Sequence, residues 1–381
     1  MPKISFSEEY DVMVCGGGVA GIAAALSAVR NGASCVLVEK QCMLGGLGTA
    51  GLVTIYLPLC DGMGNQMIFG IGEELLRLSI KHGHEARYPA AWLEGGTKEE
   101  RAKKRFEVRY NAQMFAILAE QLLLSEGVKI MYDTMVTDTN VKDGKITSVT
   151  VHNRQGQGEV GVKSVVDCTG DAVVCHLAGE NCEMNDKNYF AAWYYHSTDA
   201  GYDLKPIAIN YNNPPEGEPT YDGLCYKDVN EMIIRGHREV LDDVLRRRTG
   251  EHETMPVTIP TMPSFRMTRR LAGAYTLDES EERCEFSDTI GKTGDWRKRG
   301  PVFSIPYRCL HGEKISNLLA AGRCISVTKS MWDITRVIPT CALTGEAAGA
   351  AAALTAECGS VTGFDVGKLQ KRLPINGSNV L

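Results

Sequence analysis

The chain has 381 residues, of which 44% are apolar and 23% are charged; these are ordinary globular values that exclude a disordered chain or a fibrous repeat. The formal net charge is −6 at pH 7, so no broad basic field is available to attract nucleic acid or an anionic membrane. Glycine is abundant, with 40 residues. Such an excess indicates turns, close helix contacts or ligand cradles.

The first forty residues predict a strand, a glycine turn, a helix and a second strand. Val12–Cys15 is a short apolar run, and Gly16–Gly21 interrupts it. Ile22–Arg30 is apolar on all sides, and Ala33–Val38 is apolar again and ends at Glu39. This order of elements is one complete βαβ unit.

The rest of the chain alternates helical and strand patterns. Apolar residues at helical spacing predict further helices over residues 66–82, 111–126, 228–248 and 340–357. Between residues 134 and 168, β-branched runs separated by glycine turns predict a β meander. A last strand is expected over residues 318–321, and the tyrosine-rich residues 186–226 are expected to form a loop-rich cap. No uninterrupted apolar run is long enough for a membrane-spanning helix.

The glycine turn contains a Gly-x-Gly-x-x-Gly pattern, which is weak evidence alone. In a chain this rich in glycine the pattern is expected by chance roughly 0.4 times. It occurs three times, starting at Gly16, Gly46 and Gly156. Only Gly16 follows a predicted strand, precedes a long helix and has an acid, Glu39, at the distance expected for a ribose-binding carboxylate.

The residues of the first match suit a dinucleotide. Gly16 makes the tight turn, Gly18 allows a pyrophosphate to approach the backbone, and Gly21 lets the helix lie close to the strands. The positive end of the helix dipole then stabilises phosphate charge. A flavoprotein and a nicotinamide-dependent dehydrogenase share this opening, so the cofactor has to be decided elsewhere in the chain.

Three distant segments decide it, because they resemble the FAD-dependent oxidoreductases of the glutathione-reductase-like superfamily. They are the double-glycine segment Glu39–Gly51, the Thr-Gly-Asp segment Val165–Asp171, and the C-terminal pair Asn317–Ser326 and Arg336–Gly349. Together with Thr268–Tyr275 they extend over nearly the whole chain. The sequence is therefore identified as similar to the broad family of FAD-dependent oxidoreductases.

The resemblance implies an α/β fold with a doubly wound parallel sheet, in which a Rossmann-like FAD domain with a β meander carries an inserted α+β substrate domain. We expect a discontinuous FAD domain over residues 1–55, 105–172 and 310–381, and a cap over residues 56–104 and 173–309. The expected FAD-binding residues are Gly16, Gly18, Val19, Ala20, Gly21, Glu39, Lys40, Gly45, Gly46, Gly48, Thr49, Val136, Thr169, Gly170, Gly322, Arg323, Arg336, Thr340, Cys341 and Ala342.

The last predicted helix has a second possible purpose. Thr340 is a good helix N-cap and Pro339 precedes it. A helix N-terminus directed at the flavin would stabilise the negative charge that develops on two-electron reduction. A tightly packed core helix explains the same small residues, and the two interpretations are compatible. Asp171 is expected either in the Thr-Gly-Asp turn or as the N-cap of a helix over residues 172–177.

Four residues are candidates for catalysis. His196 lies in the aromatic cap and has a side chain suited to acid–base work, although a packed histidine is an equally simple interpretation. Arg266 belongs to a basic group that suits a carboxylate or structural ion pairs. Tyr307 and Asp333 are expected near the flavin if the family topology holds.

The thirteen cysteines include no Cys-x-x-Cys pair, so neither a zinc site nor a disulfide framework is expected, and no metal is predicted. No histidine precedes Lys81, and Cys42 and Cys60 have no feature that marks them as attachment points. We therefore expect FAD to be bound noncovalently.

The sequence thus predicts an FAD-dependent oxidoreductase that exchanges a hydride between flavin and a small polar organic substrate. We expect a cytoplasmic protein with no nucleic-acid or membrane partner, either a homo-oligomer or a donor to an electron-acceptor protein. Three alternatives stay open: an NAD(P)-dependent dehydrogenase, a flavin-dependent tRNA-modifying protein, and a flavoprotein subunit of a larger complex.

Overall fold

The computed structural model describes residues 4–82, 89–199, 201–209, 213–248 and 254–377. Its central sheet has the strand order β5-β2-β1-β8-β7-β6, and β18 pairs with the C-terminal end of β8. The strands are β1 (Ile4–Cys15), β2 (Cys35–Val38), β5 (Lys129–Met131), β6 (Met135–Lys142), β7 (Lys145–Asn153), β8 (Gly156–Asp167) and β18 (Leu318–Ala320). β5, β2, β1, β8 and β18 are parallel, and β6, β7 and β8 form the antiparallel meander. The predicted α/β class with a parallel Rossmann-like sheet is confirmed.

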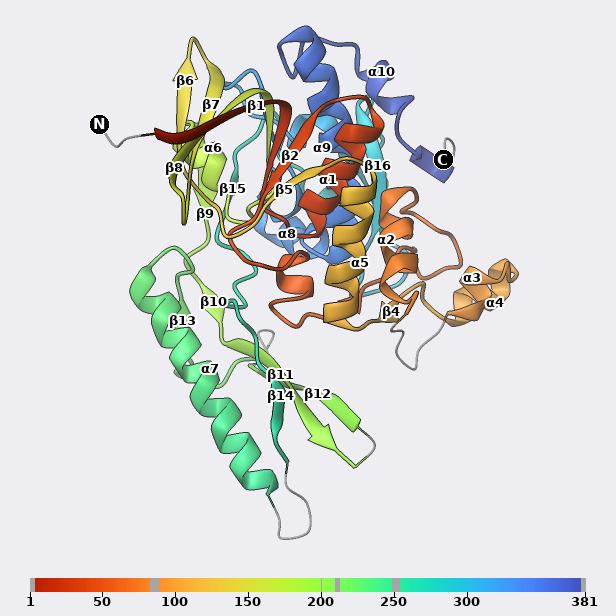
Figure 1. Cartoon of the computed structure of the whole chain (residues 1–381). Coiled ribbons are helices and arrows are strands. Elements are labelled where there is room, and N and C mark those ends of the chain that lie inside the picture. The colour runs from red at the N-terminus through yellow and green to blue at the C-terminus, as the bar shows by residue number, and fades with distance from the viewer. Residues whose placement is uncertain (1–3, 83–88, 200, 210–212, 249–253, 378–381) are drawn as a thin grey trace.

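Both faces of the sheet are covered, which explains why its central strands read as continuous apolar runs. In β1, Val12 and Val14 pack into the core shared with the helices, whereas Met13 and Cys15 pack into a second core with the meander. The helices of the body are α1 (Val19–Arg30), α2 (Ile71–Ser79), α5 (Ala112–Ser125), α6 (Val173–Leu177), α8 (Lys329–Thr335), α9 (Ile338–Cys358) and α10 (Val366–Gln370). Figure 1 shows α1, α5 and α9 on one side of the parallel strands and the short helix α6 beside the meander strands.

The first and last long helices, α1 and α9, pack directly on each other. A Cβ added at Gly345 would lie 2.2 Å from the carbonyl oxygen of Ala20, and one added at Gly349 would lie 2.1 Å from that of Ala24. Only glycine permits this approach. The contact holds the C-terminal part of the chain against the N-terminal βαβ unit.

Helix α9 begins earlier than its sequence predicts. Its N-cap is Val337, and Pro339 lies inside the first turn, where a missing N–H costs nothing. The prediction that Thr340 is the N-cap is therefore wrong. The Thr340 hydroxyl is buried and shares a hydrogen bond of 2.8 Å with the hydroxyl of Thr293.

No single described helix is long and apolar enough to cross a membrane. Helices α8 and α9 meet that condition only as a pair bent by 91°, and most of α9 is buried in the core.

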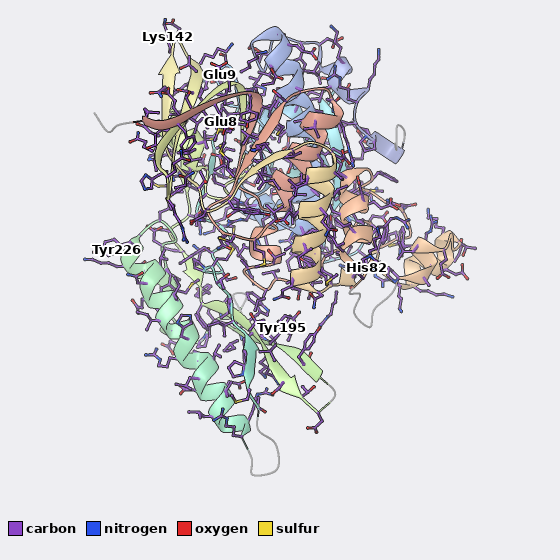
Figure 2. The ribbon with its side chains drawn as sticks, in the orientation of Figure 1. Glu8, Glu9, His82, Lys142, Tyr195 and Tyr226 are labelled. Carbon is purple, nitrogen blue, oxygen red and sulfur yellow. The ribbon has the colours of Figure 1, made fainter. Side chains whose placement is uncertain are left out.

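A lobe projects from one end of the body, and it consists of α7 (Tyr226–Arg247) lying along the sheet β12-β11-β14 (Figure 1). The strands are β11 (Ala191–Thr198), β12 (Gly201–Ala208) and β14 (Pro256–Thr258), and the short pair β10 (Asn188–Tyr189) and β13 (Thr220–Tyr221) lies nearer the body. Tyr195 lies where β11 approaches the body (Figure 2), and its hydroxyl shares a hydrogen bond of 2.9 Å with that of Thr54. Much of the tyrosine-rich segment, which was expected to be loop-rich, forms strands β10 to β13 of this lobe.

Two parts of the predicted cap pack in the body instead. Residues 56–104 carry α2, α3 (Ala90–Leu93) and α4 (Lys98–Lys103), and buried side chains of α2 share one core with α1 and α9. Trp92 stacks on Phe106 in this same core, at 5.1 Å between ring centroids. The hairpin of β16 (Thr289–Gly294) and β17 (Val302–Pro306) packs against α9. The projecting lobe is therefore smaller than the predicted cap.

A buried carboxyl on α9 generates the first testable prediction. Burial raises the pKa of Glu346 to about 8, and the carboxylate accepts a hydrogen bond from the Ile71 amide at 3.1 Å. Because the folded state holds this proton more tightly than the unfolded chain, Glu346 contributes stability at low pH that is lost as pH rises from about 4.5 to about 8.

The variant Glu346→Gln keeps an acceptor for the Ile71 amide and removes the titration. Its free energy of unfolding, measured by urea at pH 5 and pH 8.5, should fall less with pH than that of the wild type, by on the order of a few kcal/mol. Glu357→Gln, at an exposed position of the same helix, is the control and should retain the wild-type pH dependence. An equal change in the free energy of unfolding between pH 5 and pH 8.5 for wild type and Glu346→Gln would refute the raised pKa of Glu346.

Candidate cofactor site

A cavity opens at the carboxyl ends of β1, β2, β8 and β18, where ligands of open parallel sheets bind. Segments from both ends of the chain line it. Sixteen of the predicted cofactor residues are among them: Gly16, Gly18, Val19, Ala20, Glu39, Lys40, Gly45, Gly46, Gly48, Val136, Thr169, Gly170, Gly322, Arg323, Arg336 and Cys341.

Four predicted cofactor residues lie outside this lining and have structural contacts instead. A Cβ at Gly21 would lie 1.8 Å from the carbonyl oxygen of Gly16, so Gly21 closes the turn. The buried Thr49 hydroxyl donates to the carbonyl of Leu44. Thr340 bonds to Thr293, as described above, and Ala342 is fully buried in α9.

The glycine turn leaves free space where a ligand could approach the backbone. Gly16 has φ +103°, and a Cβ there would lie 2.6 Å from the carbonyl oxygen of Cys168. Gly18 is the N-cap of α1 with an ordinary φ of −66°, and an added Cβ would meet no heavy atom within 4 Å. Packing therefore explains Gly16, whereas at Gly18 the turn borders open cavity. Free amides at a helix N-terminus beside open space suit a phosphate group.

Glu39 holds the turn from the neighbouring strand. Its two carboxylate oxygens accept hydrogen bonds from the amides of Gly17, at 2.7 Å, and Gln41, at 2.8 Å. Burial raises the pKa of this carboxyl, while the two backbone hydrogen bonds oppose that rise. A carboxylate fixed in this way keeps acceptor sites for the hydroxyls of a ribose.

An aspartate that the sequence did not single out supports the next wall of the cavity. Asp167 is fully buried at the end of β8 and accepts hydrogen bonds from the Thr169 amide and hydroxyl and from the Cys175 amide. Ala172 follows in the left-handed conformation, with φ +46°. Asp167 thus organises the turn that presents Thr169 and Gly170 to the cavity.

Asp171 belongs to this turn and is not a helix N-cap. Helix α6 begins at Val173 after the left-handed Ala172. The Asp171 carboxylate accepts a hydrogen bond of 2.6 Å from the Thr268 hydroxyl and lies 3.7 Å from the guanidinium of Arg323. Of the two expectations for Asp171, the structure confirms the turn.

Two arginines from the C-terminal segments border the cavity. Arg323 donates hydrogen bonds to the carbonyls of Phe265, at 2.8 Å, and Arg266, at 3.0 Å. Arg336 forms an ion pair with Asp333, whose other carboxylate oxygen lies 3.5 Å from Arg297. Both guanidinium groups are therefore held in position before any ligand binds.

None of the four catalytic candidates is in the lining of this cavity. His196 is buried in β11, with Nδ1 2.9 Å from the Ser197 carbonyl. Arg266 stacks over Trp193. Tyr307 is buried, and its hydroxyl donates to the carbonyl of Val361 at 2.8 Å.

Asp333 lies outside the lining and forms an ion pair with Arg336, which lines the cavity. The sequence analysis did not predict the Asp333–Arg336 ion pair, although the two residues are three positions apart, a spacing that brings side chains together on one helical turn.

Two cysteines line the cavity, and neither is activated. Burial raises the pKa of the Cys341 thiol to about 12 and that of Cys168 well above its ordinary value. Both thiols therefore stay protonated at neutral pH. Within the ranges that the structure describes, no group of three or more His, Cys, Asp or Glu side chains is arranged to hold a metal ion.

The sequence reasoning missed part of the lining. Gln41, Leu47 and Met135 directly adjoin predicted residues and Thr134 is two positions from Val136, so this nearness in sequence was their signal. Met262 comes from the segment that leads back out of the projecting lobe, and its amino-acid neighbours give no indication of a site. Thr261, beside it, donates its amide to the carbonyl of Ala50, which fixes this segment against the double-glycine loop.

Comparisons with known proteins agree with this geometry. Over 79 residues the chain is 34% identical to a thioredoxin reductase of Ureaplasma parvum, a match that covers 21% of this chain and only about a quarter (26%) of that protein. A p-nitrophenol 4-monooxygenase from Pseudomonas putida has a similar fold, with a TM-score of 0.54 and 13% identity over 96% of this chain and 84% of that one.

The family model for FAD dependent oxidoreductases matches residues 11–191 and 186–373. These two matches together extend over nearly the whole chain and include every segment that lines the cavity. The chain therefore belongs to the family of FAD-dependent oxidoreductases, whose cofactor is FAD.

Proposed function

We propose that the chain binds FAD noncovalently in the cavity beside β1, β2, β8 and β18 and uses it to oxidise or reduce a small organic substrate. The observation that carries the proposal is the open space at Gly18, enclosed by segments from both ends of the chain. The protonated state of Cys168 and Cys341 supports noncovalent binding, because a neutral thiol is a poor nucleophile.

The lining offers a partner for each chemical part of FAD. The free amides at the start of α1, beside Gly18, would hold the pyrophosphate, and Glu39 would accept hydrogen bonds from the adenosine ribose. Val136 would hold the adenine through its backbone. Arg336, Ile338 and Cys341 at the start of α9 would border the flavin ring, where the helix dipole favours negative charge.

Bound FAD supplies a two-electron carrier that takes a hydride from a substrate C–H bond or returns one. In the oxidising direction the substrate loses that hydride and a heteroatom proton, so it carries a polar group at the reacting carbon. Arg336, held by Asp333, would orient an anionic or carbonyl oxygen of the substrate or stabilise negative charge on the ring. None of the four predicted catalytic side chains is in the lining, whose carboxylates are Glu39 and Asp171.

The proposal includes a cytoplasmic location and either a homo-oligomer or an electron-acceptor protein as partner. Gel filtration of the purified chain, together with an activity assay on that chain alone, distinguishes an independent enzyme from a flavoprotein subunit of a larger complex. A tRNA-modifying activity would require RNA to stay bound at physiological salt, which the net charge of −6 disfavours.

The cofactor content of the purified protein tests the proposal first. We expect a yellow protein with an absorbance maximum at about 450 nm, one FAD per chain, and complete release of the flavin on denaturation. Colourless protein that binds NADH, or flavin that stays attached to the denatured chain, would contradict the proposal.

Gly18→Val should remove FAD without unfolding the protein. An added Cβ meets no heavy atom within 4 Å and the backbone is unstrained there, so the larger side chain would extend into the space that a ligand in the cavity occupies. We expect the FAD content to fall at least about tenfold, equivalent to about 1.4 kcal/mol, with thermal unfolding of the apoprotein unchanged. Gly367→Val, in a short helix outside the cavity lining, is the control. Full FAD occupancy in Gly18→Val would show that phosphates bind elsewhere.

Arg336→Gln should lower the reduction potential of the bound flavin. Removing a positive charge from the cavity wall destabilises the reduced, more negative flavin, by on the order of tens of millivolts. Arg336→Lys keeps the charge and should retain most of the potential. Arg308→Gln, which removes an arginine paired with Asp288 outside the lining, should leave it unchanged. Dye-equilibrium titration measures all three, and an unaltered potential in Arg336→Gln would place this residue away from the ring.

A further inference from the structure

A second cavity, of about 210 Å³, lies inside the projecting lobe next to the cofactor cavity. It lies between β11, α7 and the segment of residues 260–264. Its lining consists of Ala191, Ala192, Met232, Ile233, Gly236, His237, Val240, Pro260, Thr261, Met262, Pro263 and Ser264. Met262 lines both cavities, so the two cavities adjoin at this flexible residue.

The composition of this lining selects an uncharged ligand. The described lining contains no Lys, Arg, Asp or Glu, and most of its residues are apolar. Its one titratable side chain is His237, which is exposed. An engineered apolar cavity of ~150 Å³ holds one benzene molecule. The volume in the lobe therefore fits one substituted ring or a short branched alkyl group.

One polar group in this lining lacks a partner. Ser264 is 5% exposed, and its Oγ has no hydrogen-bond partner. A buried, unsatisfied hydroxyl costs about 1–3 kcal/mol. A ligand oxygen within reach of Ser264 would supply the missing hydrogen bond.

A glycine in the middle of α7 keeps the cavity open. Gly236 lies in a 22-residue helix, where glycine costs up to about 1 kcal/mol relative to alanine. No tight contact requires it, because an added Cβ would lie 3.7 Å from Phe190 and 3.8 Å from Ala192, which are ordinary separations. A longer side chain at this position would fill the cavity.

We propose that this second cavity binds the apolar body of the enzyme's substrate, a small monocyclic compound with one hydroxyl or carbonyl oxygen near Ser264. The inference rests on the proposed function, since it places the substrate beside the FAD cavity at Met262. It also narrows the substrate class to a compound with an apolar body that carries, besides the polar group at the reacting carbon, one oxygen near Ser264.

Calorimetric titration of the FAD-loaded protein with 4-ethylphenol tests the proposal, with the visible difference spectrum of the flavin as a second readout. Wild type should bind the probe and perturb the flavin spectrum. Gly236→Leu should weaken binding at least tenfold while FAD content stays the same and thermal stability does not fall. Ile234→Leu, at a position of the same helix that is 63% exposed, should bind as wild type does. Ala192→Leu fills the cavity from the facing strand and should weaken binding even if Gly236→Leu fails to fold.

Ser264→Ala separates the hydroxyl from the shape of the cavity. It should weaken binding of 4-ethylphenol about fivefold to tenfold and leave binding of ethylbenzene unchanged. Wild-type affinity in Gly236→Leu, or no binding to the FAD-loaded wild type, would overturn the proposal. Equal losses for both probes in Ser264→Ala would overturn the assignment of the hydroxyl. If the protein takes up no FAD but still binds 4-ethylphenol, the proposed function is refuted and the cavity assignment stands.

Discussion

The site depends on one contact, the close packing of α1 on α9. At Gly345 and Gly349, α9 approaches the carbonyl oxygens of Ala20 and Ala24 more closely than any side chain would allow. This approach brings Gly322 and Arg336, from the last quarter of the chain, to the same cavity as the glycine turn at residues 16–21. A βαβ unit alone would offer only one wall. Helix packing and backbone exposed to the cofactor thus add to the left-handed turns that require many of the other glycines.

Local patterns allowed much of the cavity to be predicted. The strand, turn and helix around Gly16 depend on neighbours in sequence, and the position of Glu39 follows from the length of one βαβ unit. The C-terminal residues were identified through the family resemblance, because nothing local relates Arg336 to Gly16. Thr340 was misplaced because Pro339 is compatible with the residue before a helix and with its first turn, and the choice depends on tertiary contacts.

The remainder of the site could not be predicted, because it depends on how the lobe folds against the body. His196 was a reasonable candidate by residue type, yet β11 buries it beside Tyr194. Met262 has no recognisable motif and lines both cavities, because its segment is fixed by Thr261 to the double-glycine loop. Asp167 accepts hydrogen bonds from the amides of the turn that follows β8, and no sequence motif predicts these bonds. The substrate end therefore depends on tertiary structure, whereas local sequence encodes the wall of the cofactor cavity that carries Gly16 and Glu39.

Hydrogen exchange with and without FAD, followed by mass spectrometry, tests the central claim most directly. If segments from both ends of the chain enclose one FAD, the cofactor should slow exchange together at residues 16–21, 134–136 and 322–345 and at the segment around Met262. Protection confined to the N-terminal βαβ unit, with the C-terminal segments unchanged, would contradict the account.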